Sequence, residues 1–466
     1  MAKSRRFYIF KVILPLILLI VLIVWVCSRW NVWFGNIPEP SYVIPNKVQR
    51  VLLTVGPDAD SRYISWQDSA RLEGDETTTV EYVDYHSLST PSDTLTIESK
   101  PTVYQSRAGV GAFYHVLLKG LRMGESYKYR VRSSRDTTDW CCFEMDTTCH
   151  YSFLYMGDVQ DELDGGFDSL LPSIMERNRN TSFLLFGGDL IERPMDCYWD
   201  LVFRSLDTFA TRYPIVCVPG NHEYLKGLSR KLERRFTLTF PYYEVEDESD
   251  NALFSFAKGD ARFFLLDSNK DIWDLGEQRD WLKKQLAECK EQWKIVVLHH
   301  PLHSIKGAAN NLGVKAYFDG VVKEAGVDLV LQGHEHAYAR SSVELTESGE
   351  VTSPLYVVTY CSRKDYAMKF YGDVEKWGTD DRFYQQISVS KDSLVVRTFG
   401  AEHNLYDDVV LVKDEKGKRL IDRGKEIPQK IQVSEWFRKN KSAKKVKKFE
   451  QSIREWKEKH GDENNK

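Results

Sequence analysis

The chain has 466 residues, of which 42% are hydrophobic and 28% charged, a composition typical of folded globular proteins rather than disordered ones. Its formal net charge of −4 is small for this length, so no broad basic field indicates nucleic acid as the main partner. At about 150 residues per domain, the length allows two folded domains plus terminal segments.

A long apolar run opens the chain. Basic residues up to Lys11 precede residues 12–26, and Trp30, Trp33 and Phe34 follow as an aromatic belt typical of a membrane interface. Because no small-x-small cleavage pattern follows Val26, we interpret residues 1–35 as an uncleaved membrane anchor, with a cleaved signal peptide as the alternative. Under both interpretations the basic residues stay in the cytoplasm and the rest of the chain is exported, to the periplasm or the cell exterior.

Residues 46–148 show the period-two pattern of β-strands. Residues 80–85 and 127–132 alternate apolar or aromatic with charged side chains, and glycine-containing turns separate such segments. Several short strands over about a hundred residues predict a β-sandwich. The segment carries no metal-ligand pattern, which favours a packing or spacer module. A disulfide involving Cys141, Cys142 or Cys149 stays open.

Residues 150–413 change to short apolar strands alternating with amphipathic helices. Five apolar runs each end in a polar cluster, at residues 156–160, 187–192, 219–223, 299–301 and 332–336. Open α/β sheets bind ligands at the carboxyl ends of their strands, so these clusters predict one shared crevice. Six of the 11 histidines lie in or beside the clusters, a concentration that favours a metal site.

Taken singly, these residues have simpler interpretations. An aspartate after a strand, such as Asp158 or Asp189, is commonly a turn or capping residue. Asn221 could supply a left-handed turn. We interpret His300 as a neighbour of a ligand and His303 as a surface group or a second neighbour. The ordered set of five clusters is what makes the pattern specific.

The ordered set resembles the calcineurin-like metallophosphoesterase superfamily, whose motifs run Asp-x-His, Gly-Asp, Gly-Asn-His-Asp/Glu, His and Gly-His-x-His. Residues 333–340 follow the Gly-His-x-His-x-Tyr-x-Arg pattern of its purple-acid-phosphatase branch, and residues 118–131 with 143–147 resemble the fibronectin-III-like domain that precedes the catalytic domain there. The resemblance covers roughly residues 47 to 400 and implies an α/β fold: two packed β-sheets flanked by helices, after a fibronectin-III-like sandwich and an N-terminal transmembrane helix.

The resemblance also implies a dinuclear metal centre of zinc, iron or manganese, among which the ligand types do not choose. Asp189 would bridge the ions, Asn221, His299 and His334 would complete one site, and Asp158 and His336 would serve the other. The centre would activate a hydroxide to attack a small phosphorylated substrate, a monoester or a diester. His222 would then act as the acid that protonates the leaving alkoxide. Glu223 either helps to orient His222 or is a solvated side chain.

Two positions depart from the family pattern. Gln160 stands where the superfamily has a histidine ligand, and its amide oxygen would be a weaker ligand. Glu192 stands where purple acid phosphatases have the tyrosine that binds ferric iron, so we predict a colourless enzyme. The alternative is a catalytically silent, membrane-anchored binding protein on the same fold. Substrate choice would come from loops at residues 191–199, 224–250 and 304–317.

The end of the chain becomes polar. Residues 387–390 and 394–398 are predicted to be the last strands of the catalytic domain, and residues 414–466 a polar, Lys-rich, partly helical extension. Phe449, Ile453 and Trp456 have helical spacing, which predicts a helix that docks on the body or on a partner. Contact of the lysines with anionic lipid, and a solvated helix face, are the alternatives.

Overall fold

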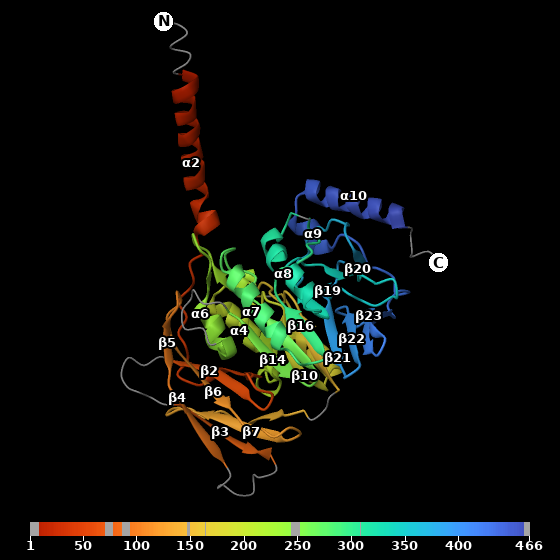
Figure 1. The fold of residues 1–466 in the computed structure, drawn as a ribbon. Coiled ribbons are helices and arrows are strands. Elements are labelled where there is room, and N and C mark those ends of the chain that lie inside the picture. The colour runs from red at the N-terminus through yellow and green to blue at the C-terminus, as the bar shows by residue number, and fades with distance from the viewer. Residues whose placement is uncertain are drawn as a thin grey trace.

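The computed structural model describes residues 9–69, 78–85, 94–146, 150–163, 165–243, 252–307 and 309–460. A π-helical turn, η1 (Ile9–Ile13), leads into the apolar helix α2 (Leu14–Phe34), which projects away from the body (Figure 1). By length and composition α2 could cross a membrane, with a mean hydropathy of 2.0 in its best window, although a signal sequence passes the same test. The helix extends beyond the predicted apolar run and includes the aromatic belt.

Residues 49–144 form two four-stranded antiparallel sheets that face each other, as the sequence predicts. Tyr129 and Trp66 are buried between them. The predicted strands at residues 80–85 and 127–132 correspond to β3 and β7. One sheet contains β1 (Gln49–Val55), β2 (Arg62–Ser69), β6 (Val110–Leu118) and β5 (Thr102–Gln105); the other contains β4 (Leu95–Ser99), β3 (Thr78–Asp84), β7 (Ser126–Arg132) and β8 (Cys141–Glu144). Cys141 and Cys142 are free thiols, and Cys149 lies outside the described residues.

Two seven-stranded sheets form the rest of the body. The first has the order β11 (Ile215–Cys217), β10 (Thr181–Phe186), β9 (Tyr151–Met156), β21 (Tyr384–Val389), β22 (Ser393–Phe399), β23 (Leu405–Asp414) and β24 (Gly417–Asp422). The second has the order β14 (Phe254–Lys258), β15 (Ala261–Leu265), β16 (Trp293–Val297), β17 (Leu329–Gln332), β19 (Leu355–Val358), β18 (Tyr338–Ser341) and β20 (Val374–Gly378).

The main apolar core lies between these two sheets and includes Phe153, Phe183 and Phe263. A second core packs the helices α7 (Leu275–Glu288) and α8 (Leu312–Glu324) against the other face of the second sheet. The shorter elements connect the strands. They are α3 (Phe167–Arg177), α4 (Asp196–Leu206), α5 (Phe209–Arg212), η4 (Asn221–Glu223), β12 (Tyr224–Leu225), β13 (Lys231–Leu232), α6 (Arg234–Thr239), η5 (Pro241–Tyr243), α7 (Leu275–Glu288) and α8 (Leu312–Glu324).

The five strands that precede the polar clusters are divided between the two predicted sheets, since β9, β10 and β11 belong to the first sheet, and β16 and β17 belong to the second. The structure corrects one expectation about these sheets. The predicted last strands are β21 and β22, but β23 and β24 continue the first sheet by antiparallel pairing. The polar segment after residue 414 therefore begins with a sheet strand. The proposed domain boundaries themselves stay a prediction.

The sandwich packs directly on the body formed by the two seven-stranded sheets, which favours a packing module over a spacer. The hydroxyl of Thr54 donates to the carbonyl of Ile215 over 2.5 Å, and that of Ser65 donates to Thr239 over 2.7 Å. Tyr63 joins the main core. These contacts combine the two units into one body.

The chain ends in two helices, α9 (Glu435–Asn440) and α10 (Ala443–His460). Phe437, Phe449 and Ile453 are buried in an apolar cluster with Ile305 and Trp377 of the body. The predicted helix therefore docks on the body. The lysines of α10 that face away from this cluster remain exposed.

Candidate metal centre

Strained backbone positions direct the candidate ligands. Asp158, Asp189, His334 and His336 all have positive φ, at 45°, 52°, 70° and 48°. Residues other than glycine rarely adopt this region, at a cost of about 1–3 kcal/mol each, and such strain clusters at functional sites. Beside them, a Cβ on Gly333 would lie 2.3 Å from Oδ2 of Asp158. Only glycine leaves room for that carboxylate.

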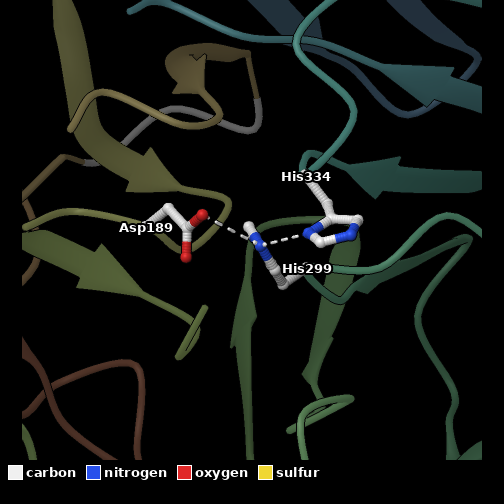
Figure 2. A group of neighbouring side chains, drawn as sticks. All are labelled: Asp189, His299 and His334. Atoms are coloured by element: carbon white, nitrogen blue, oxygen red, sulfur yellow. Dashed lines mark hydrogen bonds and ion pairs between the residues drawn. The ribbon is translucent and has the colours of Figure 1, made fainter. Parts of the chain in front are cut away.

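One group of side chains gathers around the ends of β10 and β16. The carboxylate of Asp189 and the imidazoles of His299 and His334 point toward one another (Figure 2). Nε2 of His299 lies 3.3 Å from Oδ2 of Asp189. Oδ1 of Asn221 lies 2.8 Å from Nδ1 of His334 and 3.3 Å from Nε2 of His299. The ends of four strands, β10, β11, β16 and β17, thus converge on one small volume.

A second group shares Asp189 with the first. Asp158, Asp189 and His336 each offer an atom within 4.8 Å of the others. Gln160 joins them, with its Nε2 3.2 Å from Oδ2 of Asp189 and 3.2 Å from Nε2 of His336. The common carboxylate places two candidate cation sites side by side. The structure therefore brings all seven predicted ligands together.

Backbone contacts orient the imidazole rings. Nδ1 of His299 lies 2.9 Å from the carbonyl of Gly187, and Nδ1 of His336 lies 2.8 Å from the carbonyl of Lys364. Donation to these carbonyls fixes the tautomer that leaves Nε2 as a lone-pair donor, as is common for histidines that bind metals.

The chemistry of the pocket fits cations. Among the described residues, Oδ1 of Asp158 is buried without a hydrogen-bond partner, a costly arrangement unless a cation satisfies it. Burial, together with the neighbouring Asp189 carboxylate, raises the pKa of Asp158 to about 8. Burial lowers the pKa of His334 and His336 well below the usual value, which keeps them neutral and able to act as ligands. Carboxylate, amide and imidazole donors suit zinc, iron and manganese alike.

His222 stands at the wall of this centre. Its backbone N–H donates to Oδ1 of Asp189 over 2.9 Å, its Nδ1 lies 2.6 Å from the carbonyl of Glu192, and its Nε2 is 3.8 Å from Oδ2 of Asp189. Burial lowers the pKa of His222, but the Asp189 and Glu192 carboxylates outweigh it, so the pKa is raised. The ring lines a cavity of about 570 Å³. It is placed to give a proton to a group in that cavity.

Glu223 has a role that the sequence did not predict. The side chain is fully buried, and its carboxylate accepts the backbone N–H groups of Asp189, Leu190, Ile191 and Gly220 over 2.6–3.1 Å. The solvated interpretation is wrong. The carboxylate instead fixes the turn that carries Asp189. Its place directly after His222 in the Gly-Asn-His-Glu motif is the only signal in the sequence.

Two lysines near the centre were also missed. Lys364 forms an ion pair with Glu192, and Nζ of Lys306 donates to the carbonyl of His334 over 3.2 Å. Burial lowers the pKa of Lys306. Both lysines come from segments without a recognisable motif.

The other histidines lie where the sequence places them. The ring of His300 packs at a tilt of 46° against that of His334, with centroids 4.2 Å apart, and burial lowers the pKa of His300 to about 3. His303 binds Asp319 over 2.8 Å. Neither joins the two candidate cation groups.

Two of the three loops predicted to select substrates line the cavity beside His222, through Glu192–Met195, and through residues 224–227 with Arg230. Residues 244–251 lie outside the described residues. The third loop, at residues 304–317, lines a separate cavity of about 740 Å³. The first two loops are therefore the ones that face the candidate centre.

Comparison with known proteins agrees with this geometry. Residues 151–338 match the family model of the calcineurin-like phosphoesterases. A probable purple acid phosphatase 20 of Arabidopsis thaliana is 26% identical over 53% of this chain and 60% of its own length, and a phosphoenolpyruvate phosphatase of Allium cepa is 27% identical over 50% and 51%. The chain spans about half the length of most of the curated relatives it matches.

Solved structures share the fold. A purple acid phosphatase from yellow lupin (Lupinus luteus) seeds matches with a TM-score of 0.64 at 16% identity, over 81% of this chain and 76% of that one. A structure of PhoD matches with a TM-score of 0.60 at 14% identity, over 89% and 99%. At these identities the likeness concerns the fold, including the predicted α/β sheets and the preceding sandwich.

Proposed function

Because residues 151–338 form a calcineurin-like phosphoesterase domain, we propose that this chain hydrolyses phosphate esters with two metal ions, outside the cytoplasm. One observation carries the proposal: two groups of buried ligand atoms share the carboxylate of Asp189. A bridging carboxylate is the arrangement that two adjacent cations need.

Each side chain has a part in this proposal. Asp189 would bridge the ions, with Asn221, His299 and His334 on one side, and Asp158, Gln160 and His336 on the other. When bound, the ions supply Lewis acidity toward the phosphoryl oxygens and the attacking water. Gln160 would bind a metal ion through Oε1. This requires the amide oxygen and nitrogen of Gln160 to exchange places, because the assignment of these two atoms rests on hydrogen bonding.

His222 would protonate the departing alkoxide. The Asp189 and Glu192 carboxylates raise its pKa above the usual value, which favours the protonated ring, and its contact with the carbonyl of Glu192 holds the ring at the cavity wall. Loss of such an acid slows hydrolysis by about 10²–10⁴-fold. The effect grows with the basicity of the leaving group, because a poor leaving group depends most on the proton.

The helix α2 would hold the enzyme in the membrane with the catalytic body outside. The basic residues before it favour a cytoplasmic N-terminus. Hydrogen bonds join Val32 in its last turn, and Asn36 after it, to Lys226 of the body. This supports an anchor over a cleaved signal.

The test uses the full chain in detergent, with metal content measured before assay. Release of p-nitrophenol from mono- and diesters is compared with release of phosphate from an alkyl monoester. We expect His222→Asn to keep its metal and to lose more activity on the alkyl ester than on the aryl ester. His303→Asn, in a histidine outside the centre, is the matched control. If none of these esters is hydrolysed with zinc, iron or manganese supplied, the catalytically silent binding protein is the correct interpretation.

A further inference from the structure

The cavity beside the candidate metal centre is bounded by the end of the N-terminal helix. Its wall includes Trp33 from the last turn of α2, and Gly35, Asn36 and Ile37 directly after it. Asn221, His222 and His334 of the candidate site line the same cavity. No spacer therefore separates the apolar helix from the site.

Hydrogen bonds hold this junction in place. The side-chain amide of Asn36 donates to the carbonyl of Lys226 over 2.8 Å and accepts its N–H over 2.9 Å. Nζ of Lys226 reaches the carbonyl of Val32, inside α2, over 3.3 Å. Arg107 of the sandwich donates to the carbonyl of Ile37 over 2.8 Å. The end of the helix is thus fixed to the rim of the cavity rather than tethered loosely.

The length of α2 determines where the mouth of the cavity lies relative to the bilayer. The 21 residues of α2 span about 32 Å at 1.5 Å per residue, close to the ~30 Å hydrocarbon core of a bilayer. Trp30, Trp33 and Phe34 pack together at its C-terminal end, where aromatic side chains mark the interface. Gly35–Ile37 would then lie among the lipid headgroups, and so would the mouth of the cavity.

The loops around this mouth expose large apolar side chains. Leu228, on the hairpin between β12 and β13, is 82% exposed, and Trp273, before α7, is 83% exposed. The two loops are joined by the hydroxyl of Ser229, which donates to Asp271 over 2.8 Å. The hairpin is the one whose Lys226 holds the end of α2. Exposed apolar side chains beside a membrane helix are typical of a surface that dips into the bilayer interface.

Positive charge accompanies these apolar side chains. Lys226 and Arg230 line the cavity and are exposed. In Figure 1, α2 leaves the body at the top and α10 lies across the top of the body. The exposed lysines of α10 include Lys444, Lys445, Lys447 and Lys448. Basic side chains near a membrane surface attract anionic lipid.

We infer that the substrate is the phosphorylated headgroup of a membrane lipid, which enters the cavity from the bilayer while its chains stay in the membrane; this rests on the function proposed above. In the reaction, the oxygen of water bonds to phosphorus as the bond from phosphorus to the lipid-side oxygen breaks. That oxygen leaves with the electron pair and takes the proton of His222, which regains one from the attacking water.

Two aryl phosphates with the same chromophore test the inference. One carries a long alkyl chain and is embedded in phosphatidylcholine vesicles that contain the full chain; the other lacks the alkyl chain and stays in water. We expect kcat/KM to favour the alkyl-bearing ester by about tenfold or more. We expect Leu228→Ser with Trp273→Ser to remove that preference while leaving hydrolysis of the soluble ester unchanged.

The control is Leu95→Ser with Val103→Ser. These side chains are 57% and 55% exposed but lie on β4 and β5 of the sandwich, away from α2 (Figure 1). Equal kcat/KM for the two esters, or a preference that survives in the Leu228 and Trp273 double variant, would overturn the inference and leave the proposed function intact. If the metal-loaded protein hydrolyses neither ester, the proposed function itself is refuted.

Discussion

Replacement of Glu223 by glutamine tests whether a buried carboxylate holds the turn that carries Asp189. The carboxylate accepts four backbone N–H groups over 2.6–3.1 Å. The amide oxygen of a glutamine can accept two of them, but its NH₂ group would face the other two N–H groups, and two donors cannot form a hydrogen bond. Each buried donor left without a partner costs about 1–3 kcal/mol, so the loss is about 2–6 kcal/mol. That is a large part of the 5–15 kcal/mol that stabilises a typical protein.

The same change should weaken metal binding. Groups that orient metal ligands typically contribute about 10–100-fold to affinity, and Glu223 accepts the N–H of Asp189, the residue proposed to bridge the ions. We would measure urea unfolding by tryptophan fluorescence, and metal retained after dialysis against increasing chelator. Asp407→Asn is the control, because Asp407 is buried and accepts from Tyr338 and Arg340 without contacting the centre. We expect Asp407→Asn to lose stability and keep its metal. Equal metal affinity in Glu223→Gln and the unchanged protein would refute the reasoning.

Three further predictions concern separate parts of the chain. Gln160→His should retain metal about tenfold more tightly against chelator, because imidazole is a stronger ligand than an amide; unchanged retention would mean that this position does not bind metal. The purified protein should show no visible tyrosinate-to-iron band, because Glu192, paired with Lys364, occupies the tyrosine position; such a band would contradict the assignment. Phe449→Ala should lower the free energy of unfolding by about 3–5 kcal/mol in urea titration, because the ring is 2% exposed against the body, and equal stability would show that docking of α10 contributes nothing.

The candidate ligands could be predicted from the sequence because their signals are local. Each lies in a polar cluster after a short apolar strand, and several, such as Asp189 and His334, sit beside a glycine, so period and turn chemistry reveal them together. Glu223 and Lys364 could not be found in this way, since their roles depend on backbone groups and side chains far along the chain. Of the two strands beyond the predicted last ones, β24 was missed for a related reason. It is an edge strand in which the charged Lys418 is buried and the apolar Ile421 is exposed, so it lacks the apolar alternation of a buried strand.

The assignment of strands to sheets also needed the structure. The runs that end at Asp158 and at His299 look alike in sequence, but β9 is paired with β21 in the first sheet, while β16 is paired with β15 and β17 in the second. Hydrophobic pattern fixes which face of a strand is buried but not its neighbour. The centre therefore lies where two sheets meet, a position that a single-sheet argument does not give.

The segment after α2 should be needed for stability, not only for anchoring. The carboxylate of Glu39, 1% exposed, accepts from Nη1 and Nη2 of the buried Arg235 over 2.7 and 3.0 Å and from the N–H of Asp196 over 2.7 Å. Removing one partner of a buried ion pair costs about 3–5 kcal/mol. A soluble form that begins at Asn36 should therefore unfold at clearly higher urea than one that begins at Ser41. Glu39→Gln in the longer form should reproduce most of the loss, because it removes the charge and keeps the chain. If both forms unfold at the same urea concentration, Arg235 is satisfied by its other carboxylates, and the segment after α2 serves only to place the helix.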